Sequence, residues 1–202
     1  EASRLVFGCG ASLSGRARED LLETAFDAGV NVFDVGYKHY YDDAEKHLGP
    51  FARRRRDDIF LISKAIVPGD IGPDDDPPAA ELRRAADGWS ALLDESLTEL
   101  GVDHVDAYYL MASNNPRVVA SEEIHRAFER ARAAGKVSHL GLSTHQNAER
   151  VLSAAVDTGR FDLAMVAITP GGWYDWETRE VLPGSPPMKD LRPQLERARA
   201  TG

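Results

Sequence analysis

The chain has 202 residues, 43% of them hydrophobic, and its 33 acidic against 24 basic residues give a net charge of −9. This size is typical of a globular domain with a substantial core, and the acidic balance argues against nucleic acid or an anionic membrane surface as a partner. No run approaches the roughly 18 apolar residues of a membrane-spanning helix, and Glu1-Ala2-Ser3 is unlike the start of a signal peptide. We therefore expect a cytoplasmic location.

Taken in chain order, short β-rich runs alternate with longer segments of helical periodicity. We predict strands at 4–8, 30–34, 58–64, 104–111, 137–143 and 163–168, and helices at 18–28, 43–54, 78–100, 121–134, 147–158 and 188–200. Units of about 33 residues leave room for crossover connections, so the strands should be parallel. Two architectures fit a single domain over residues 1–202: an open doubly wound sheet, or a (β/α)₈ TIM barrel of which about six βα units are present.

Two segments interrupt this alternation. Residues 169–187 hold two of the three tryptophans in a Pro/Gly-rich stretch. Long loops often face a substrate, so Trp173, Tyr174 and Trp176 are candidates for an aromatic substrate wall, and a loop packed on the end of the sheet is the alternative. We interpret residues 70–78 (DIGPDDDPP) as a solvated acidic loop and the run Arg53–Arg56 as the solvated end of a helix.

Two charged residues end otherwise apolar strands, Asp34 and Lys64. Ligands of parallel α/β proteins bind at the C-terminal ends of the strands, and ionised groups rarely lie there without a partner. The two residues could pair simply to offset desolvation. Alternatively, the aspartate holds the lysine charged, and the lysine lowers the pKa of a neighbouring tyrosine toward useful proton transfer to a carbonyl oxygen. The residues alone leave both hypotheses open.

Four segments, in this order, resemble the aldo-keto reductases: GVNVFDVGYKHYYDDAEKHLG, RRDDIFLISKA, SLTELGVDHVDAYYLM and GKVSHLGLSTH. The resemblance extends over most of the chain, from Arg4 to Thr169. It implies a (β/α)₈ TIM barrel that reduces an aldehyde or ketone with NADPH, in which hydride passes from the nicotinamide to the carbonyl carbon and a tyrosine protonates the oxygen. It also implies that Asp34 and Lys64 have the roles of the family's aspartate and lysine.

The resemblance leaves the proton donor open among three neighbouring residues. Counting five residues forward from the aspartate, as in the family, arrives at His39. Counting back from the Ala-Glu pair, which resembles the family's Ser-Glu, arrives at Tyr41, and Tyr40 lies between the two. We favour Tyr41 or Tyr40 as the donor, with His39 as the alternative.

Other positions depart from the family's pattern. Met111 ends the fourth strand where the family has a histidine, and a thioether cannot donate a hydrogen bond to a substrate oxygen. Ser143 and Thr144 resemble the Ser-Asn pair that holds the nicotinamide carboxamide, with Thr in place of Asn, and Gly8 is a further candidate contact with the cofactor. Met111, Trp173 and Tyr174 are the candidate substrate contacts.

Three rival hypotheses remain. A nucleotide-binding Rossmann unit would use Gly8 and Gly10, but its third glycine is replaced by Leu13. A metal-dependent hydrolase would need convergent ligands, and the six histidines do not have metal-binding spacing, so no metal is expected. The third is a reductase-like barrel without turnover that acts as a binding or regulatory protein. Open edges at the first and sixth strands also predict association into a homo-oligomer.

Overall fold

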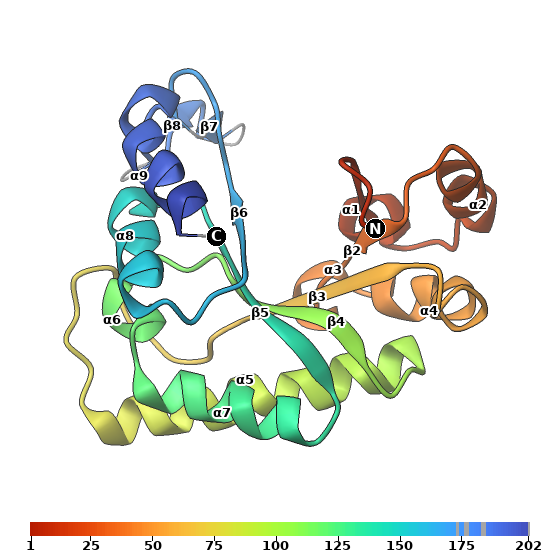
Figure 1. The fold of residues 1–202 in the computed structure, drawn as a ribbon, viewed down its shortest axis with the longest axis horizontal. Coiled ribbons are helices and arrows are strands. Elements are labelled where there is room, and N and C mark those ends of the chain that lie inside the picture. The colour runs from red at the N-terminus through yellow and green to blue at the C-terminus, as the bar shows by residue number, and fades with distance from the viewer. Residues whose placement is uncertain (173, 176–177, 183–184, 202) are drawn as a thin grey trace. The chain divides into compact units, whose positions relative to one another are not determined.

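The structure is a computed structural model that describes residues 1–172, 174–175, 178–182 and 185–201. Its elements follow one another along the chain (Figure 1) as β1 (Val6–Gly8), α1 (Cys9–Leu13), α2 (Glu19–Asp27), β2 (Val32–Asp34), α3 (Lys38–Tyr41), α4 (Ala44–Arg54), β3 (Phe60–Ile66), α5 (Ala79–Leu100), β4 (Val105–Met111), α6 (Pro116–Val119), α7 (Glu122–Ala133), β5 (Val137–Thr144), α8 (Ala148–Thr158), β6 (Leu163–Val166), β7 (Tyr174–Asp175), β8 (Glu180–Val181) and α9 (Met188–Ala200). The first six strands form one sheet in chain order, and β7 pairs with β8. Among the described residues, no helix combines the length and the apolar character needed to cross a membrane.

The six predicted strands and six predicted helices are confirmed, with small shifts at their ends. One shift matters for the site, because β3 continues to Ile66 and Lys64 therefore lies within the strand rather than at its last residue. Three short helices, α1, α3 and α6, were not predicted. Each has only four or five residues, which is too short for hydrophobic periodicity to reveal.

The residues group into two compact units. The first comprises Glu1–Ala65, Trp89–Tyr109 and Arg130–His139, and the second comprises Ile66–Gly88, Leu110–Glu129 and Leu140–Gly202. In the first unit, β1, β2 and β3 pair in parallel, and the register places Asp34 between Gly8 and Ile62. Strand β2 is buried along its whole length. Its Phe33 packs on Phe51 of α4 with 4.8 Å between the ring centroids, so a hydrophobic strand carries the Asp34 carboxylate to the end of the sheet.

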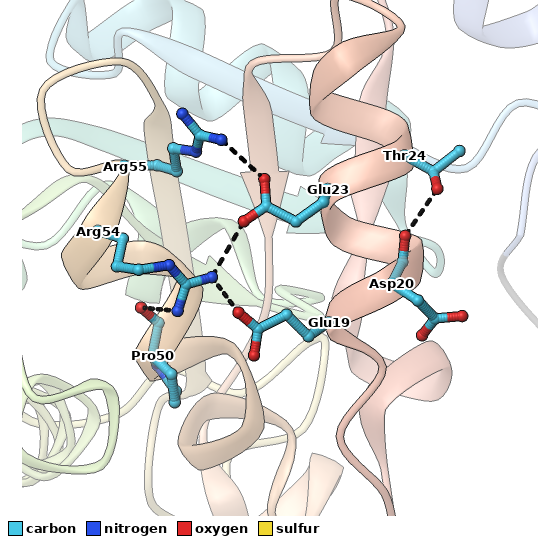
Figure 2. Close-up of polar contacts among 7 residues, drawn as sticks. All are labelled: Glu19, Asp20, Glu23, Thr24, Pro50, Arg54 and Arg55. Atoms are coloured by element: carbon cyan, nitrogen blue, oxygen red, sulfur yellow. Dashed lines mark hydrogen bonds and ion pairs between the residues drawn. The ribbon is translucent and has the colours of Figure 1, made fainter.

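The arginine run lies at the end of α4, where Arg53 and Arg54 are exposed as predicted, but its side chains also bind neighbouring elements. Figure 2 shows that Arg54 binds both Glu19 and Glu23 of α2 and that Arg55 binds Glu23, with 2.9 Å between the charged atoms of Arg55 and Glu23. The Arg55 guanidinium also lies 4.5 Å from the centroid of the Phe26 ring. The end of α4 therefore holds α2 through several partly exposed contacts, because long arginine side chains can reach a neighbouring helix from an exposed position.

The two remaining arginines of the run bind other elements. Arg53 donates to the carbonyl oxygen of Leu100, at the end of α5, at 3.0 Å. Arg56 forms an ion pair with Asp106 of β4 at 2.9 Å. The four consecutive arginines thus connect α4 to three different parts of the first unit.

In the second unit, β5 and β6 pair in parallel, with Ser143 opposite Met165 and Thr144 opposite Val166. Helices α8 and α9 pack side by side (Figure 1). The segment 169–187, expected to be irregular, contains the short antiparallel ladder of β7 and β8, in which Tyr174 pairs with Val181. Strands of two residues lie below what sequence alternation can detect.

Candidate active site

A buried ion pair joins the two charged residues of the predicted site. Asp34 ends β2, Lys64 lies on the adjacent β3, and the Lys64 ammonium donates to Oδ2 of the Asp34 carboxylate. The two residues are only 7% and 5% exposed. Burial raises the pKa of Asp34, although the Lys64 charge opposes this effect. Within the described part of the chain, Oδ1 of Asp34 has no hydrogen-bond partner, so the carboxylate keeps an acceptor for a ligand or water.

The Tyr41 ring lies beside this pair and is tightly enclosed. The Lys64 Nζ atom is 5.5 Å from the centroid of the ring. A Cβ atom added at Gly10 would lie 2.5 Å from a ring carbon of Tyr41, and one added at Gly36 would lie 2.8 Å from another. Since real Cβ contacts are longer than this, only glycine fits at both positions. The two glycines therefore let Tyr41 approach the ion pair.

The pKa of Tyr41 is raised, whereas from the sequence we considered that Lys64 would lower it. Partial burial raises the pKa of Tyr41 to about 12, and the negative charge of Asp34 and the neighbouring Tyr40 add to the shift. The expected lowering by Lys64 does not occur because the lysine charge is already paired with Asp34. The phenol is therefore protonated throughout the neutral range, as a proton donor requires.

The two other candidate donors lie away from the ion pair. The Nε2 atom of His39 is 3.1 Å from Oε2 of Glu95 on α5, and the His39 side chain is 55% exposed. Tyr40 is 59% exposed, and its ring meets the Tyr41 ring edge-on at 4.8 Å. Of the three residues, Tyr41 is thus the one that the fold brings to Asp34 and Lys64.

The end of β1 contributes Gly8 and Cys9 to the same unit. A Cβ atom added at Gly8 would meet no other atom within 4 Å, so this strand end borders open space. Cys9 is buried, and burial raises the pKa of its thiol, as in a packed thiol rather than a nucleophile. Over the described ranges of the chain, no three His, Cys, Asp or Glu side chains gather in an arrangement that could hold a metal ion.

In the second unit, Ser143 connects the ends of β4 and β5. Its Oγ atom accepts a hydrogen bond from the amide of Ala112 at 3.0 Å, and its carbonyl oxygen accepts one from the amide of Ser113 at 2.7 Å. The hydroxyl of Thr144 donates to the carbonyl oxygen of Gln146 at 3.1 Å. Among the described residues, the Ser143 hydroxyl hydrogen has no acceptor and the Thr144 oxygen has no donor, so a donor and an acceptor are left over.

Met111 lies at the end of β4 and is buried. It lines a cavity of about 470 Å³ whose wall also includes Ile71, Ser113, Asn114 and Val118. This cavity combines apolar surface with a few polar groups, as small-molecule sites commonly do.

The aromatic candidates fall partly beyond what the structure describes. Tyr174 lies on β7 and is 39% exposed. Trp173 and Trp176 lie outside the described residues, so the proposed aromatic substrate wall stays a prediction.

Sequence reasoning missed the residues that hold Tyr41 in place. Gly10 was considered only as part of an incomplete nucleotide-binding fingerprint, and Gly36 was not singled out. Glu45 was used to align the tyrosine, but its own burial was not foreseen. Gly36 directly precedes the aromatic cluster, but Gly10 lies far from it in the sequence, so the role of Gly10 is visible only once the chain has folded.

A family model described as the Aldo/keto reductase family matches residues 6–181. The chain is 29% identical over 163 residues to a D-threo-aldose 1-dehydrogenase from Pseudomonas sp, which covers 73% of this chain and 49% of that protein. It is also 29% identical over 134 residues to the NADP(+) aldo-keto reductase yakc of Schizosaccharomyces pombe, covering 64% of this chain and 37% of that protein. The chain thus spans half or less of the length of these curated relatives.

Solved structures show the same fold. A candidate aldo-keto reductase from Pseudomonas aeruginosa, 23% identical, superimposes with a TM-score of 0.66 over 99% of this chain and 70% of its own. A thermostable aldo-keto reductase in complex with the inhibitor epalrestat, 22% identical, gives a TM-score of 0.59 over 82% of this chain and 61% of its own. The six parallel βα units are therefore those of a partial (β/α)₈ TIM barrel, as predicted, and the doubly wound alternative is excluded.

Proposed function

Because the chain belongs to the aldo/keto reductase family, we propose that it reduces an aldehyde or ketone with NADPH and that Tyr41, Lys64 and Asp34 deliver the proton. The observation that carries this proposal is the Lys64 ammonium, which is buried between the Asp34 carboxylate and the Tyr41 ring. A cation fixed beside a protonated phenol stabilises the negative charge that forms when the phenol gives up its proton.

Each residue then has a defined role. Tyr41 donates its hydroxyl proton to the carbonyl oxygen while the carbonyl carbon accepts a hydride. Lys64 stabilises the phenolate that remains, and Asp34 keeps the lysine charged and oriented. Gly10 and Gly36 enclose the ring of Tyr41, which limits the orientations of the hydroxyl before reaction.

Each unit, taken by itself, offers groups that suit part of a nicotinamide cofactor, and a bound NADPH would supply the hydride. The free donor of Ser143 and the free acceptor of Thr144 match the oxygen and the amino group of a carboxamide. The Oδ1 atom of Asp34, which has no partner among the described residues, offers an acceptor to a hydroxyl, and Gly8 borders open space. The choice of NADPH is supported by the name of the Schizosaccharomyces pombe relative, which includes NADP(+).

The substrate we propose is a small carbonyl compound, with Met111 and Tyr174 among its contacts. Met111 lines the cavity in the second unit, and its thioether provides a polarisable apolar surface rather than a hydrogen-bond donor. The same residue favours a second candidate function. Without a donor at this position the protein could bind a nucleotide or carbonyl compound without turning it over, as a binding or regulatory protein.

The test is NADPH oxidation by the full-length protein, followed at 340 nm with a panel of aldehydes and ketones, alongside fluorescence titration of NADPH binding. We expect turnover in the wild type and a loss of about a hundredfold or more in kcat for Tyr41→Phe. Tyr40→Phe and His39→Ala are matched controls from the same short helix, and both should keep kcat within about threefold of the wild type.

Different outcomes would contradict different parts of the proposal. NADPH binding without turnover of any carbonyl would favour the binding protein. Turnover that survives Tyr41→Phe but is lost in Tyr40→Phe or His39→Ala would reassign the proton donor.

A further inference from the structure

Glu45 is a buried carboxyl group that the proposed reaction does not use. It lies near the start of α4, is 1% exposed, and accepts a hydrogen bond from the Ser63 hydroxyl through Oε1 at 2.7 Å. Ser63 is fully buried and lies 3.4 Å from the hydroxyl of Ser96 on α5. The other carboxyl oxygen of Glu45, Oε2, has no partner among the residues that the structure describes. Burying a carboxyl group with one oxygen unpaired costs free energy, which suggests that Glu45 has a specific role at this position.

The segment that carries Tyr41 is attached to β3 at both of its ends. At one end, the backbone amide of Tyr37 donates to the carbonyl oxygen of Lys64 at 2.9 Å. At the other end, Glu45 binds Ser63, the residue next to Lys64. Tyr41 is the central residue of this nine-residue segment, 37–45. Because side chains alternate along a strand, Ser63 can bind the end of the segment while Lys64 meets the ring at its middle.

The turn between these attachments is strained. Asp42, which follows Tyr41, has φ 51° and ψ −126°, a conformation that favours glycine. Its carboxylate accepts a hydrogen bond from the Ser14 hydroxyl at 2.8 Å. A strained backbone persists only where surrounding contacts hold it. If the attachment at Glu45 were lost, the turn could relax and move the Tyr41 ring.

We propose that Glu45 is a positioning residue: by accepting the hydrogen bond of Ser63 it closes the segment 37–45 onto β3 and so holds the Tyr41 ring over the Lys64 ammonium. Its effect on catalysis rests on the proposed carbonyl reduction, but its effect on the position of Tyr41 does not. Burial raises the pKa of Glu45, and the hydrogen bonds from Ser63 and Ser96 oppose this effect. The contact with Ser63 therefore needs only an acceptor oxygen and no negative charge.

The kinetic test uses Glu45→Ala and Ser63→Ala in the full-length protein. Each should lower kcat about tenfold to a hundredfold, as expected for a misplaced catalytic group, while KM for the carbonyl and the Kd of NADPH stay unchanged. The double variant should fall no further than either single variant, because both remove the same hydrogen bond. Glu45→Gln should retain most of kcat, since its amide oxygen can still accept from Ser63.

A matched control separates positioning from general stability. Ser121→Ala removes a buried hydroxyl from the second unit, where it accepts a hydrogen bond from the amide of Ile124 at the start of α7 at 3.3 Å. This variant should lower the melting temperature and leave kcat unchanged. A purely structural role for Glu45 would make Glu45→Ala behave in the same way, and that result would overturn the proposal.

A readout without substrate or cofactor keeps the two proposals apart. In protein labelled with ¹³C in its tyrosine rings, the Tyr41 resonance is identified by its loss in Tyr41→Phe. It should move toward the position of free tyrosine in Glu45→Ala and Ser63→Ala, and stay in place in Glu45→Gln and Ser121→Ala. If the wild type reduces no carbonyl, only the proposed function fails. The Tyr41 resonance then still shows whether Glu45 positions the Tyr41 ring. An unmoved Tyr41 resonance in both alanine variants would overturn the role of Glu45.

Discussion

In the first unit, the Lys64 ammonium lies beside the Asp34 carboxylate and the Tyr41 ring. The carboxylate bonds it directly, and the ring centroid is 5.5 Å away. Because the carboxylate neutralises most of the cation's field, Tyr41 senses mainly its own burial and the nearby Asp34, and its pKa rises to about 12. A site of this kind begins with the proton in place on the phenol and relies on Lys64 only as the proton leaves.

The raised pKa of Tyr41 predicts that the rates of carbonyl reduction and of alcohol oxidation depend differently on pH. Carbonyl reduction needs the protonated phenol, and with a pKa of about 12 the phenol is almost fully protonated at neutral pH. Loss of this proton should therefore not lower kcat between about pH 6 and 9. Alcohol oxidation needs the phenolate, so its rate should rise about tenfold per pH unit over the same range. Rate–pH profiles in both directions check this, and a reduction rate that falls with an apparent pKa near 7 or 8 would contradict it.

The enclosure of the Tyr41 ring predicts an unusual response at Gly10. Replacing a helical glycine by alanine ordinarily stabilises a protein by about 0.5–1 kcal/mol. Here the new Cβ atom would lie 2.5 Å from the ring, so Gly10→Ala should instead destabilise the fold by about 1–3 kcal/mol and lower kcat. Gly171→Ala, where a Cβ atom meets nothing within 4 Å, is the control. Thermal unfolding measures both, and a stabilised Gly10→Ala variant with normal kcat would show that the ring is free to move.

At the scale of elements, the short helix α3 and the turn that follows it decide the site. Sequence patterns predicted β2 and α4 but assigned no helix or strand to the residues between them, and counting along the chain left three candidates for the proton donor. The structure folds this stretch into one helical turn, so Lys38 and His39 reach Glu99 and Glu95 on α5, at 3.1 Å in each case. Tyr41 reaches Lys64 instead. A single turn has no hydrophobic repeat, which is why only the folded chain separates these residues.

The strained turn after α3 predicts a difference between two substitutions at one position. Asp42→Gly and Asp42→Ala both lose the hydrogen bond from Ser14, but only glycine relieves the positive φ of 51°. Glycine relieves the backbone strain but loses more conformational entropy on folding than alanine does. The net result should be that Asp42→Gly is more stable than Asp42→Ala by about 1 kcal/mol. Denaturant unfolding of both variants gives the difference directly. Equal stabilities would mean that the turn adopts another conformation.

For the molecule as a whole, apolar side chains are exposed near both edge strands of the six-stranded sheet, β1 and β6. Leu5 and Val6, at the start of β1, are 71% and 50% exposed, and Ile168, just after β6, is 47% exposed. Unpaired strand edges with exposed apolar side chains readily pair with other chains. We therefore expect an isolated 202-residue polypeptide to associate.

Light scattering of this polypeptide should give a mass well above the 22.1 kDa of one chain. Val6→Lys, which places a charge on the β1 edge, should reduce the association, because natural edge strands use lysine in the same way. A 22.1 kDa monomer that melts in one cooperative transition would contradict this prediction.

The six strands of the sheet, the six longer helices, the family resemblance and the pairing of Asp34 with Lys64 could all be predicted from the amino-acid sequence. These follow from local periodicity and from the rule that neighbouring parallel strands bring their C-terminal ends together. Three features emerged only from the folded chain: the contact of Tyr41 with Lys64, the raised pKa of Tyr41, and the hydrogen bond between Glu45 and Ser63. Those features depend on burial and on contacts between residues distant in the chain, and neither quantity is encoded in any short stretch of sequence.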